Sequence, residues 1–258
     1  MSGAADSFSL QGRRALVTGA SSGFGRHFAK VLAAAGAEVA VAARRADRLA
    51  ELVGEIEQAG GRALALSMDV TARDSVRAAF DELAARWGVV DVVVNNAGVG
   101  SSALALDCDD AAWDAVMDTN LRGAWMVAQE AAQRLVAAQR GGSIVNITSI
   151  LASRVGVSVS PYCASKAALS QLTRALALEW ARHGIRVNSL APGYFATEIN
   201  SDYLASPAGE KLKARVPFRR FGDYADLDGP LLLLASDAGR YMSGAEIVVD
   251  GGHLCSAL

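Results

Sequence analysis

Short apolar runs alternate with longer amphipathic stretches along almost the whole chain. The runs have the length of buried strands, and the stretches place apolar residues at the spacing of a helix face. Strands are expected near residues 14–18, 38–43, 63–68, 91–95, 143–148, 185–190 and 245–249. Helices are expected near residues 23–35, 46–59, 73–87, 109–137, 161–182 and 226–236.

This alternation indicates β-α-β units, which form a parallel sheet with helices on both faces. Right-handed crossovers give a doubly wound sheet of seven parallel strands in the order 3-2-1-4-5-6-7. The chain shows no repeat, low-complexity stretch or linker, so residues 1–258 are expected to form a single Rossmann-type α/β domain. Ligands of such sheets bind beyond the carboxyl ends of the strands.

One segment, residues 194–222, departs from this rhythm and has weak periodicity. A loop this long in a compact domain is usually functional. Its cations are Lys211, Lys213, Arg215, Arg219 and Arg220. They allow two interpretations, an anionic substrate such as a coenzyme A thioester or a solvated helix followed by a framework turn. We favour the second, because charge runs are usually solvated faces.

The first apolar run leads directly into a glycine-rich turn, spaced G-x-x-x-G-x-G. Such a turn between a strand and a helix lets the backbone approach a pyrophosphate, and the helix N-terminus favours negative charge. The spacing differs from the standard G-x-G-x-x-G, so an ordinary turn is the alternative interpretation. The residues expected at this nucleotide site are Gly19, Ser21, Ser22, Gly23, Phe24 and Gly25.

The end of the second predicted strand indicates which nucleotide binds. A carboxylate here would grip the ribose 2′-hydroxyl of NAD, but the strand ends in Ala43 and is followed by Arg44 and Arg45. Arginine binds phosphate well through its planar fork, so the sequence favours NADP(H) over NAD(H). The alternative is that both arginines are solvated helix-start residues. We expect one of them to be so, and prefer Arg44 for the contact.

Tyr162 and Lys166 carry the second chemical signal. Residues four apart share one helix face, about one turn apart. A neighbouring ammonium favours the phenolate, so Lys166 is expected to lower the pKa of Tyr162, which is about 10 in water. Ser149, at a predicted strand end, can hold a carbonyl oxygen against the phenol. These three residues indicate a proton-transfer site.

From about Leu10 to Gly252 the chain resembles the short-chain dehydrogenase/reductase family. Thr18–Gly25 matches its T-G-x-x-x-G-x-G motif and Asn95–Gly98 its N-N-A-G. Asp69 and Val70 match the positions after strand three, and Asn120 matches a helix asparagine. Ser149, Tyr162 and Lys166 match the catalytic positions, and Pro192-Gly193 with Thr197 matches P-G-x-x-x-T. Together, in order and at family spacing, these matches are highly specific.

The resemblance implies hydride transfer between a nicotinamide and a carbonyl or secondary alcohol. Tyr162 is expected to act as general acid or base, Ser149 to hold the substrate oxygen, and Lys166 also to bind the nicotinamide ribose. Asn120 is expected to hold a water that connects Lys166 to solvent, although an asparagine can simply stabilise a helix irregularity. The other implied cofactor contacts are Asp69, Val70, Asn96, Ala97, Gly98, Pro192, Gly193 and Thr197.

The substrate stays open at this point. Candidate substrate contacts are Ser149, Leu151, Tyr162, Tyr194 and Phe195. Val155, Val157 and Val159 indicate an apolar pocket wall or, alternatively, core packing. Small ketones, sugars, polyols, steroid-like ketones and 3-oxoacyl thioesters are all possible. Residues 177–180 lack the arginine with which carrier-protein reductases often dock, which disfavours an acyl carrier protein. A non-catalytic nicotinamide-binding regulator is a remote alternative.

The amino-acid composition gives information on the kinds of molecule that the protein binds. Apolar residues make up 52% and charged residues 20%, as in globular proteins, and a net charge of −2 offers no argument for nucleic acid or membrane. The first eleven residues lack the pattern of a signal peptide, and the scattered cysteines and histidines form no zinc pattern. A cytoplasmic protein is expected. The resemblance further implies a homotetramer, with a dimer as the alternative, that pairs the helices near 109–137 and 161–182.

Overall fold

The structure is a computed structural model that describes residues 4–100, 102–197 and 200–255. Seven parallel strands form one sheet in the order β3-β2-β1-β4-β5-β6-β7, which confirms the predicted topology. The strands are β1 (Arg14–Thr18), β2 (Glu38–Ala43), β3 (Arg62–Ser67), β4 (Val92–Asn95), β5 (Gly142–Ile147), β6 (Ile185–Pro192) and β7 (Glu246–Val249).

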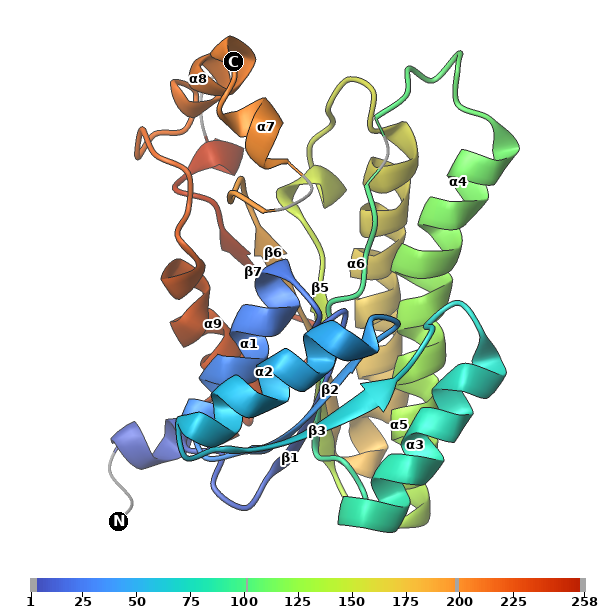
Figure 1. The fold of residues 1–258 in the computed structure, drawn as a ribbon. Coiled ribbons are helices and arrows are strands. Elements are labelled where there is room, and N and C mark those ends of the chain that lie inside the picture. The colour runs from blue at the N-terminus through green and yellow to red at the C-terminus, as the bar shows by residue number, and fades with distance from the viewer. Residues whose placement is uncertain (1–3, 101, 198–199, 256–258) are drawn as a thin grey trace.

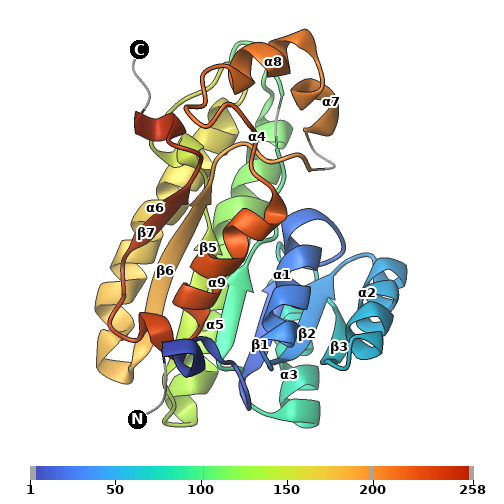
Figure 2. The same cartoon turned by 90° about the vertical axis from the view of Figure 1, so that its left-hand side faces the viewer.

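Helices cover both faces of this sheet. The helices are α1 (Gly23–Ala34), α2 (Ala46–Gln58), α3 (Arg73–Trp87), α4 (Asp110–Met117), α5 (Ala124–Ala137), α6 (Ser160–Trp180), α7 (Ser201–Leu204), α8 (Pro207–Lys213) and α9 (Asp228–Ala235). Helices α1, α2 and α9 pack on one face, and α3, α5 and α6 pack on the other (Figures 1 and 2). Among the described helices, none combines the length and hydropathy of a membrane-spanning segment.

The two faces bury separate apolar clusters, which explains why the strands read as continuous apolar runs. Leu16 and Val17 are neighbours in β1 and both are fully buried, but they belong to different clusters. Successive strand residues point to opposite faces, so a strand covered on both sides needs apolar residues at every position. The predicted strands therefore agree with the observed ones to within two residues.

The two ends of the sheet differ in what surrounds them. All strands run the same way, so their carboxyl ends meet at one edge, and α7 and α8 lie above that edge (Figures 1 and 2). The short 3-10 helix Ala4–Phe8 lies toward the opposite edge. The expected lid, residues 194–222, thus contains two short helices, and its residues 198 and 199 lie outside the described part.

One predicted helix is wrong as a single regular element. The amphipathic stretch 109–137 divides into α4, a π-helical segment Asp118–Gly123, and α5. The π segment holds Asn120, whose fully buried side chain bonds to the backbone of Val99. The widened turn therefore coincides with a tertiary contact between Asn120 and Val99, and the spacing of apolar residues along the sequence carries no information about such a contact.

Candidate active site

The glycine-rich turn is shaped by close approach of backbone atoms. A Cβ on Gly25 would lie 2.4 Å from the carbonyl oxygen of Gly19 and 2.5 Å from Nδ2 of Asn96. Gly19 itself has a φ of +64°, which favours glycine. Both positions therefore require glycine, and α1 can begin directly behind β1.

The amino end of α1 keeps its backbone N–H groups available. Ser22 is the N-cap residue, but its side chain makes no capping hydrogen bond, and the first turn holds no acidic residue. The positive end of the helix dipole is therefore not offset by a carboxylate of its own first turn. This arrangement suits an external anion such as a phosphate group.

Hydrogen bonds fasten the glycine turn to the loop after β4. The Thr18 hydroxyl accepts from the backbone N–H groups of Asn96 and Ala97, each at 3.1 Å. Nδ2 of Asn96 donates back to the carbonyl oxygens of Thr18, at 3.0 Å, and Gly19, at 3.3 Å. The sequence motifs T-G-x-x-x-G-x-G and N-N-A-G therefore meet as one structural unit at the carboxyl edge.

The two arginines after β2 lie in different surroundings. Arg45 donates to the hydroxyls of Ser21 and Ser22, with its closest contact to each at 2.9 Å, so three polar side chains converge beside the turn. Arg44 is exposed and lies close enough to Asp69 to lower its pKa, although hydrogen bonds from Thr71 lower that pKa more. The preference for Arg44 as the phosphate contact stays a prediction, and Arg45 has the geometry of a second candidate.

Ser149, Tyr162 and Lys166 meet at the carboxyl end of β5. The phenol of Tyr162 and the hydroxyl of Ser149 form a hydrogen bond. Lys166 is buried, its Nζ lies 5.6 Å from the centre of the Tyr162 ring, and it donates to the carbonyl oxygen of Ile147 at 2.8 Å. The predicted spacing on one face of α6 thus brings the three side chains into one cluster.

The direction of the phenol's pKa shift differs from the sequence-based expectation. Burial raises the pKa of Tyr162, and the hydrogen bond from Ser149 opposes this only in part. Burial also lowers the pKa of Lys166 to about 8. The net lowering expected for the Tyr162 pKa is therefore wrong for the protein alone, because burial of the phenol dominates the shift.

Asn120 has a clear structural role. Its Oδ1 accepts from the N–H of Val99 at 2.8 Å, and its Nδ2 donates to the carbonyl of Val99 at 3.0 Å and to the hydroxyl of Ser165 at 3.1 Å. These contacts fit the alternative interpretation, stabilisation of a helix irregularity. A Cβ on Gly98 would lie between Asn120 and Lys166, 3.3 Å from Oδ1 and 3.7 Å from Nζ. The water-holding role of Asn120 stays a prediction.

A buried polar chain beneath the cluster was missed by sequence reasoning. Asn95 donates to Asn146 at 2.9 Å, and Asn146 donates to Thr173 at 2.8 Å. Asn95 also donates to the carbonyl of Ala124, so the chain joins β4, β5, α5 and α6. The signal that could have revealed it is a polar residue inside an otherwise apolar strand, since such a residue must find a partner when buried.

The expected substrate residues lie in different surroundings. Phe195 is 2% exposed, and its ring packs against Phe24, with ring centres 5.3 Å apart, and under Gly222. Its prediction as a substrate contact is therefore wrong, because the ring belongs to the apolar core. Tyr194 is partly buried, and its ring lies 5.5 Å from the ring of His253. Leu151 is also partly buried, after Ser149.

Other predicted residues have identifiable surroundings. Val155 and Val157 are 86% and 84% exposed, so core packing is excluded for both. Pro192 ends β6, and Gly193 approaches Asp250 so closely that a Cβ would lie 2.7 Å from that residue's Cβ. Thr197 donates to Oδ1 of Asn200 from its backbone and its hydroxyl. The described residues contain no group of three or more acidic, histidine or cysteine side chains that could hold a metal.

The fold and this cluster together define a nucleotide-binding oxidoreductase of the Rossmann class. Residues 19–253 match the sequence profile of the family described as "Enoyl-(Acyl carrier protein) reductase". The chain belongs to the short-chain dehydrogenase/reductase family, and it is an oxidoreductase of that family.

Named relatives span nearly the full length of the chain. A 2-dehydro-3-deoxy-D-gluconate 5-dehydrogenase of Escherichia coli (strain K12) is 38% identical, over 96% of this chain and 97% of its own. An L-rhamnose 1-dehydrogenase (NAD(P)(+)) of Sphingomonas sp. (strain SKA58) is 41% identical, over 94% and 96%. The crystal structure of a gluconate 5-dehydrogenase from Burkholderia cenocepacia J2315, in complex with NADP and tartrate, superposes with a TM-score of 0.95. That structure is 38% identical and covers 99% of this chain and 100% of its own.

Proposed function

We propose that this protein is an NADP(H)-dependent dehydrogenase that interconverts a ketone and a secondary alcohol on a sugar acid. The observation that carries the chemistry is the cluster of Ser149, Tyr162 and Lys166 at the carboxyl edge of the sheet. A phenol bonded to a serine hydroxyl, beside a buried lysine, is suited to proton transfer at a substrate oxygen. The names of the relatives supply the substrate class.

The residues at the glycine turn fit a dinucleotide with a 2′-phosphate. The uncapped start of α1 and the bare backbone at Gly19 and Gly25 suit a pyrophosphate. Arg45 with Ser21 and Ser22 supplies a guanidinium and two hydroxyls for the phosphate, and Arg44 lies next in sequence. Neutral hydroxyls and cations favour a phosphate at this position, so we infer NADP(H) rather than NAD(H).

The chain's own residues perform the proton chemistry. When bound, the nicotinamide supplies or accepts a hydride. Because burial raises the pKa of Tyr162, the phenol stays protonated near neutral pH and can donate its proton to a carbonyl oxygen during reduction. Ser149, already bonded to the phenol, would hold that oxygen in place. Lys166 supplies a cation near the ring that favours the phenolate left behind.

Two cations near Tyr194 and His253 support an acidic substrate. Arg154 donates to the carbonyl oxygen of His253 at 2.9 Å, and it follows the turn that begins at Ser149. The pKa of His253 is lowered by burial first and then by the charge of Arg154, while the charge of Asp250 raises it and that of Arg215 lowers it. Both cations therefore lie near the His253 ring, which in turn lies against Tyr194. A carboxylate on a sugar acid would complement them.

Two other lid cations fit the surface interpretation instead. Lys213 pairs with Glu210 at 2.5 Å, and Arg220 pairs with Asp226 at 2.6 Å, among exposed or half-buried side chains. Surface ion pairs of this kind contribute little to the free energy of folding. We therefore assign substrate recognition to Arg154 and Arg215 and leave Lys213 and Arg220 as supports of the lid surface.

Homo-oligomeric assembly in the cytoplasm is also part of this proposal. Large apolar side chains are exposed in the two stretches expected to pair: Trp113 on α4 and Val136 on α5 in 109–137, and Leu178 on α6 in 161–182. Leu178 is 82% exposed, although burial of an apolar side chain away from water is favourable in free energy. Contact with a second copy would cover these side chains.

The experiment is a turnover assay with NADP⁺ and NAD⁺ against four substrate classes: aldonates, neutral sugars and polyols, small alcohols, and, in the reducing direction, 3-oxoacyl thioesters. We expect NADP⁺ reduction with aldonates. Arg154→Gln should raise KM for aldonates about tenfold while leaving KM for neutral sugars unchanged, as expected for loss of one charge-assisted contact. Turnover of neutral alcohols alone would contradict the sugar-acid assignment, and absence of turnover in every class would contradict catalysis.

A further inference from the structure

A second depression lies at the opposite edge of the sheet from the catalytic cluster. Its volume is about 630 Å³, and it opens at the amino ends of β4, β5 and β6. Small-molecule sites in proteins are commonly roughly 300–1,000 Å³. Arg186 and Pro192 lie near the two ends of β6, so the depression is roughly 20 Å from the catalytic edge. It is therefore separate from the cofactor and substrate site.

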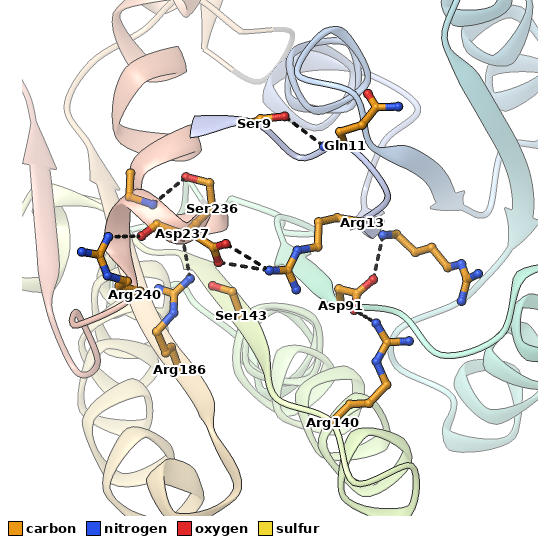
Figure 3. Close-up of polar contacts among 12 residues, drawn as sticks. Ser9, Gln11, Arg13, Asp91, Arg140, Ser143, Arg186, Ser236, Asp237 and Arg240 are labelled. Carbon is orange, nitrogen blue, oxygen red and sulfur yellow. Dashed lines mark hydrogen bonds and ion pairs between the residues drawn. The ribbon is translucent and has the colours of Figure 1, made fainter. Parts of the chain in front are cut away.

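The lining of this depression has an excess of positive charge. It includes four arginines, Arg13, Arg140, Arg186 and Arg240, but only two aspartates, Asp91 and Asp237. Figure 3 shows Arg13 and Arg186 converging on the segment around Asp237, while Arg140 reaches Asp91 from below. Two formal positive charges thus stand in excess in a chain whose net charge is −2.

Both aspartates are already occupied by other arginines. Asp237 pairs with Arg13 at 3.1 Å. Asp91, which is 3% exposed, pairs with Arg140 and accepts from the backbone N–H of Arg14 at 2.9 Å. In the part of the chain that the structure describes, Arg186 and Arg240 therefore make no ion pair. They are the source of the excess charge.

Arg186 and Arg240 are instead held by neutral carbonyl groups. Arg186 donates to the carbonyl oxygens of Leu234 at 2.9 Å and Ser236 at 3.1 Å, which end α9, and Arg240 donates to that of Asp237 at 3.3 Å. The negative end of a helix dipole offsets about half a charge. Most of the excess therefore remains. Burial lowers the pKa of Arg186, the charge of Asp237 opposes this shift, and the charge of Arg13 lowers the pKa further.

An aromatic side chain completes the lining. Tyr241 follows Arg240 directly, lines the same depression, and is fully exposed to solvent. An exposed tyrosine ring offers a flat apolar surface on which a nucleobase can stack. Arginine forks match the geometry of phosphate oxygens. A phosphate monoester carries about −1.5 to −2 charges near neutral pH, close to the excess on the protein.

We propose that this depression binds a nucleoside monophosphate, with its phosphate against Arg13, Arg186 and Arg240 and its base on Tyr241. The shared chemistry is the phosphate monoester, which a sugar phosphate also carries. The aromatic ring beside the cations favours the nucleotide over the sugar phosphate. The site does not depend on the proposed dehydrogenase function, because none of its residues belongs to the catalytic or cofactor cluster.

The test is isothermal titration calorimetry of the full chain with adenosine monophosphate, ribose 5-phosphate and inorganic phosphate. Excess NADP⁺ is present throughout, so that adenosine monophosphate cannot bind in the adenine half of the cofactor site and contribute to the measured heat. We expect binding of adenosine monophosphate. Arg13→Gln and Arg240→Gln should each weaken it at least about fivefold. Arg240 is exposed and, among the described residues, its side chain bonds only to a neutral backbone carbonyl, so Arg240→Gln should keep the fold even if Arg13→Gln does not. The matched control, Arg77→Gln on the surface of α3, should bind like the unmodified protein.

Tyr241→Ala separates the two sources of the phosphate. It should weaken adenosine monophosphate about fivefold and leave ribose 5-phosphate unchanged, as expected for the loss of base stacking. Equal binding of all three probes, unaffected by Tyr241→Ala, would overturn the nucleotide assignment. Absence of binding at millimolar concentration, or equal binding by Arg240→Gln and the unmodified protein, would overturn the site.

Discussion

The two edges of the sheet use their charged groups in opposite ways. At the carboxyl edge the central groups are a phenol and a lysine, and burial moves their pKa values in opposite directions, up for Tyr162 and down for Lys166. At the amino edge the central groups are arginines. Lysine and tyrosine can exchange protons within the range in which proteins are stable, whereas arginine stays charged. One edge is thus suited to moving protons and the other to holding fixed charge.

The supporting structure follows the same division. Under the catalytic cluster lies the uncharged chain of Asn95, Asn146 and Thr173, which fixes strand ends without adding charge near the reacting groups. At the amino edge, ion pairs such as Arg13 with Asp237 join distant segments. The contrast teaches that a single parallel sheet can separate acid–base chemistry from electrostatic binding simply by the direction of its strands. Four measurements can break or sharpen this contrast.

The largest expected effect is that of Tyr162→Phe. Removal of the phenolic hydroxyl removes the proton donor but leaves the ring in place, so kcat should fall at least about 100-fold. NADPH affinity, measured by fluorescence titration, should be retained because the Phe ring preserves the packing. A Phe variant with near wild-type turnover would show that the carboxyl edge does not transfer protons through this residue.

The second measurement uses the burial of Lys166. Below about pH 8 the lysine is charged in both states, so the full burial penalty is present. Between about pH 8 and 10.5 the unfolded chain binds more protons than the folded one, so stability rises with pH. From about pH 7 to 9.5, the unfolding free energy of the wild type should rise by about 2 kcal/mol relative to Lys166→Met. The unfolding free energies are measured by urea titration at each pH. The same pH dependence in the wild type and in Lys166→Met would contradict the lowered pKa of Lys166.

The third measurement compares the two arginines beside the nucleotide turn. Arg45 contacts Ser21 and Ser22, so Arg45→Ala should weaken NADPH binding about tenfold, or about 1.4 kcal/mol, and NADH binding much less. Arg44→Ala, measured in parallel, decides whether the second arginine shares the phosphate. Equal losses of NADPH and NADH affinity in both variants would refute the 2′-phosphate contact.

The smallest effect is expected at the amino end of β5. The buried hydroxyl of Ser143 donates to the carbonyl of Leu234 at 2.8 Å, so Ser143→Ala should cost about 1 kcal/mol of unfolding free energy. Its kcat should stay within about twofold of the wild type, since the change is roughly 20 Å from Tyr162. A large fall in kcat would mean that the two edges are coupled through the strand.

Sequence patterns were sufficient for the sheet and for most of the nucleotide turn. Strands covered on both faces are apolar at every position, as Leu16 and Val17 show, and this local signal survives in the linear sequence. The close spacing of Tyr162 and Lys166 on one helix made their juxtaposition predictable as well. What could be predicted was the strand order, which general rules of chain connection determine, and whatever one element determines by itself.

Features that depend on several elements could not be predicted. Phe195 reads as a lid residue, and only the tertiary contact with Phe24 shows that its ring joins the core. The direction of the Tyr162 pKa shift depends on how far the surrounding segments exclude water. The basic depression brings together Arg13, Arg186 and Arg240, which are far apart in sequence and meet only because the strand starts share one edge.

The π-helical segment between α4 and α5 has a consequence for chain length. A π turn holds one residue more than an α turn, so deletion of one residue from 118–123 can leave a regular helix. Each residue turns an α-helix by about 100°, and α5 would then rotate by that amount relative to α4. Val127, Ala131 and Leu135, all buried, would leave the core. The stretch from α4 to α5 can therefore regain regular hydrogen bonding only if α5 loses its packing. The number of residues in this stretch is thus more tightly constrained than their identity.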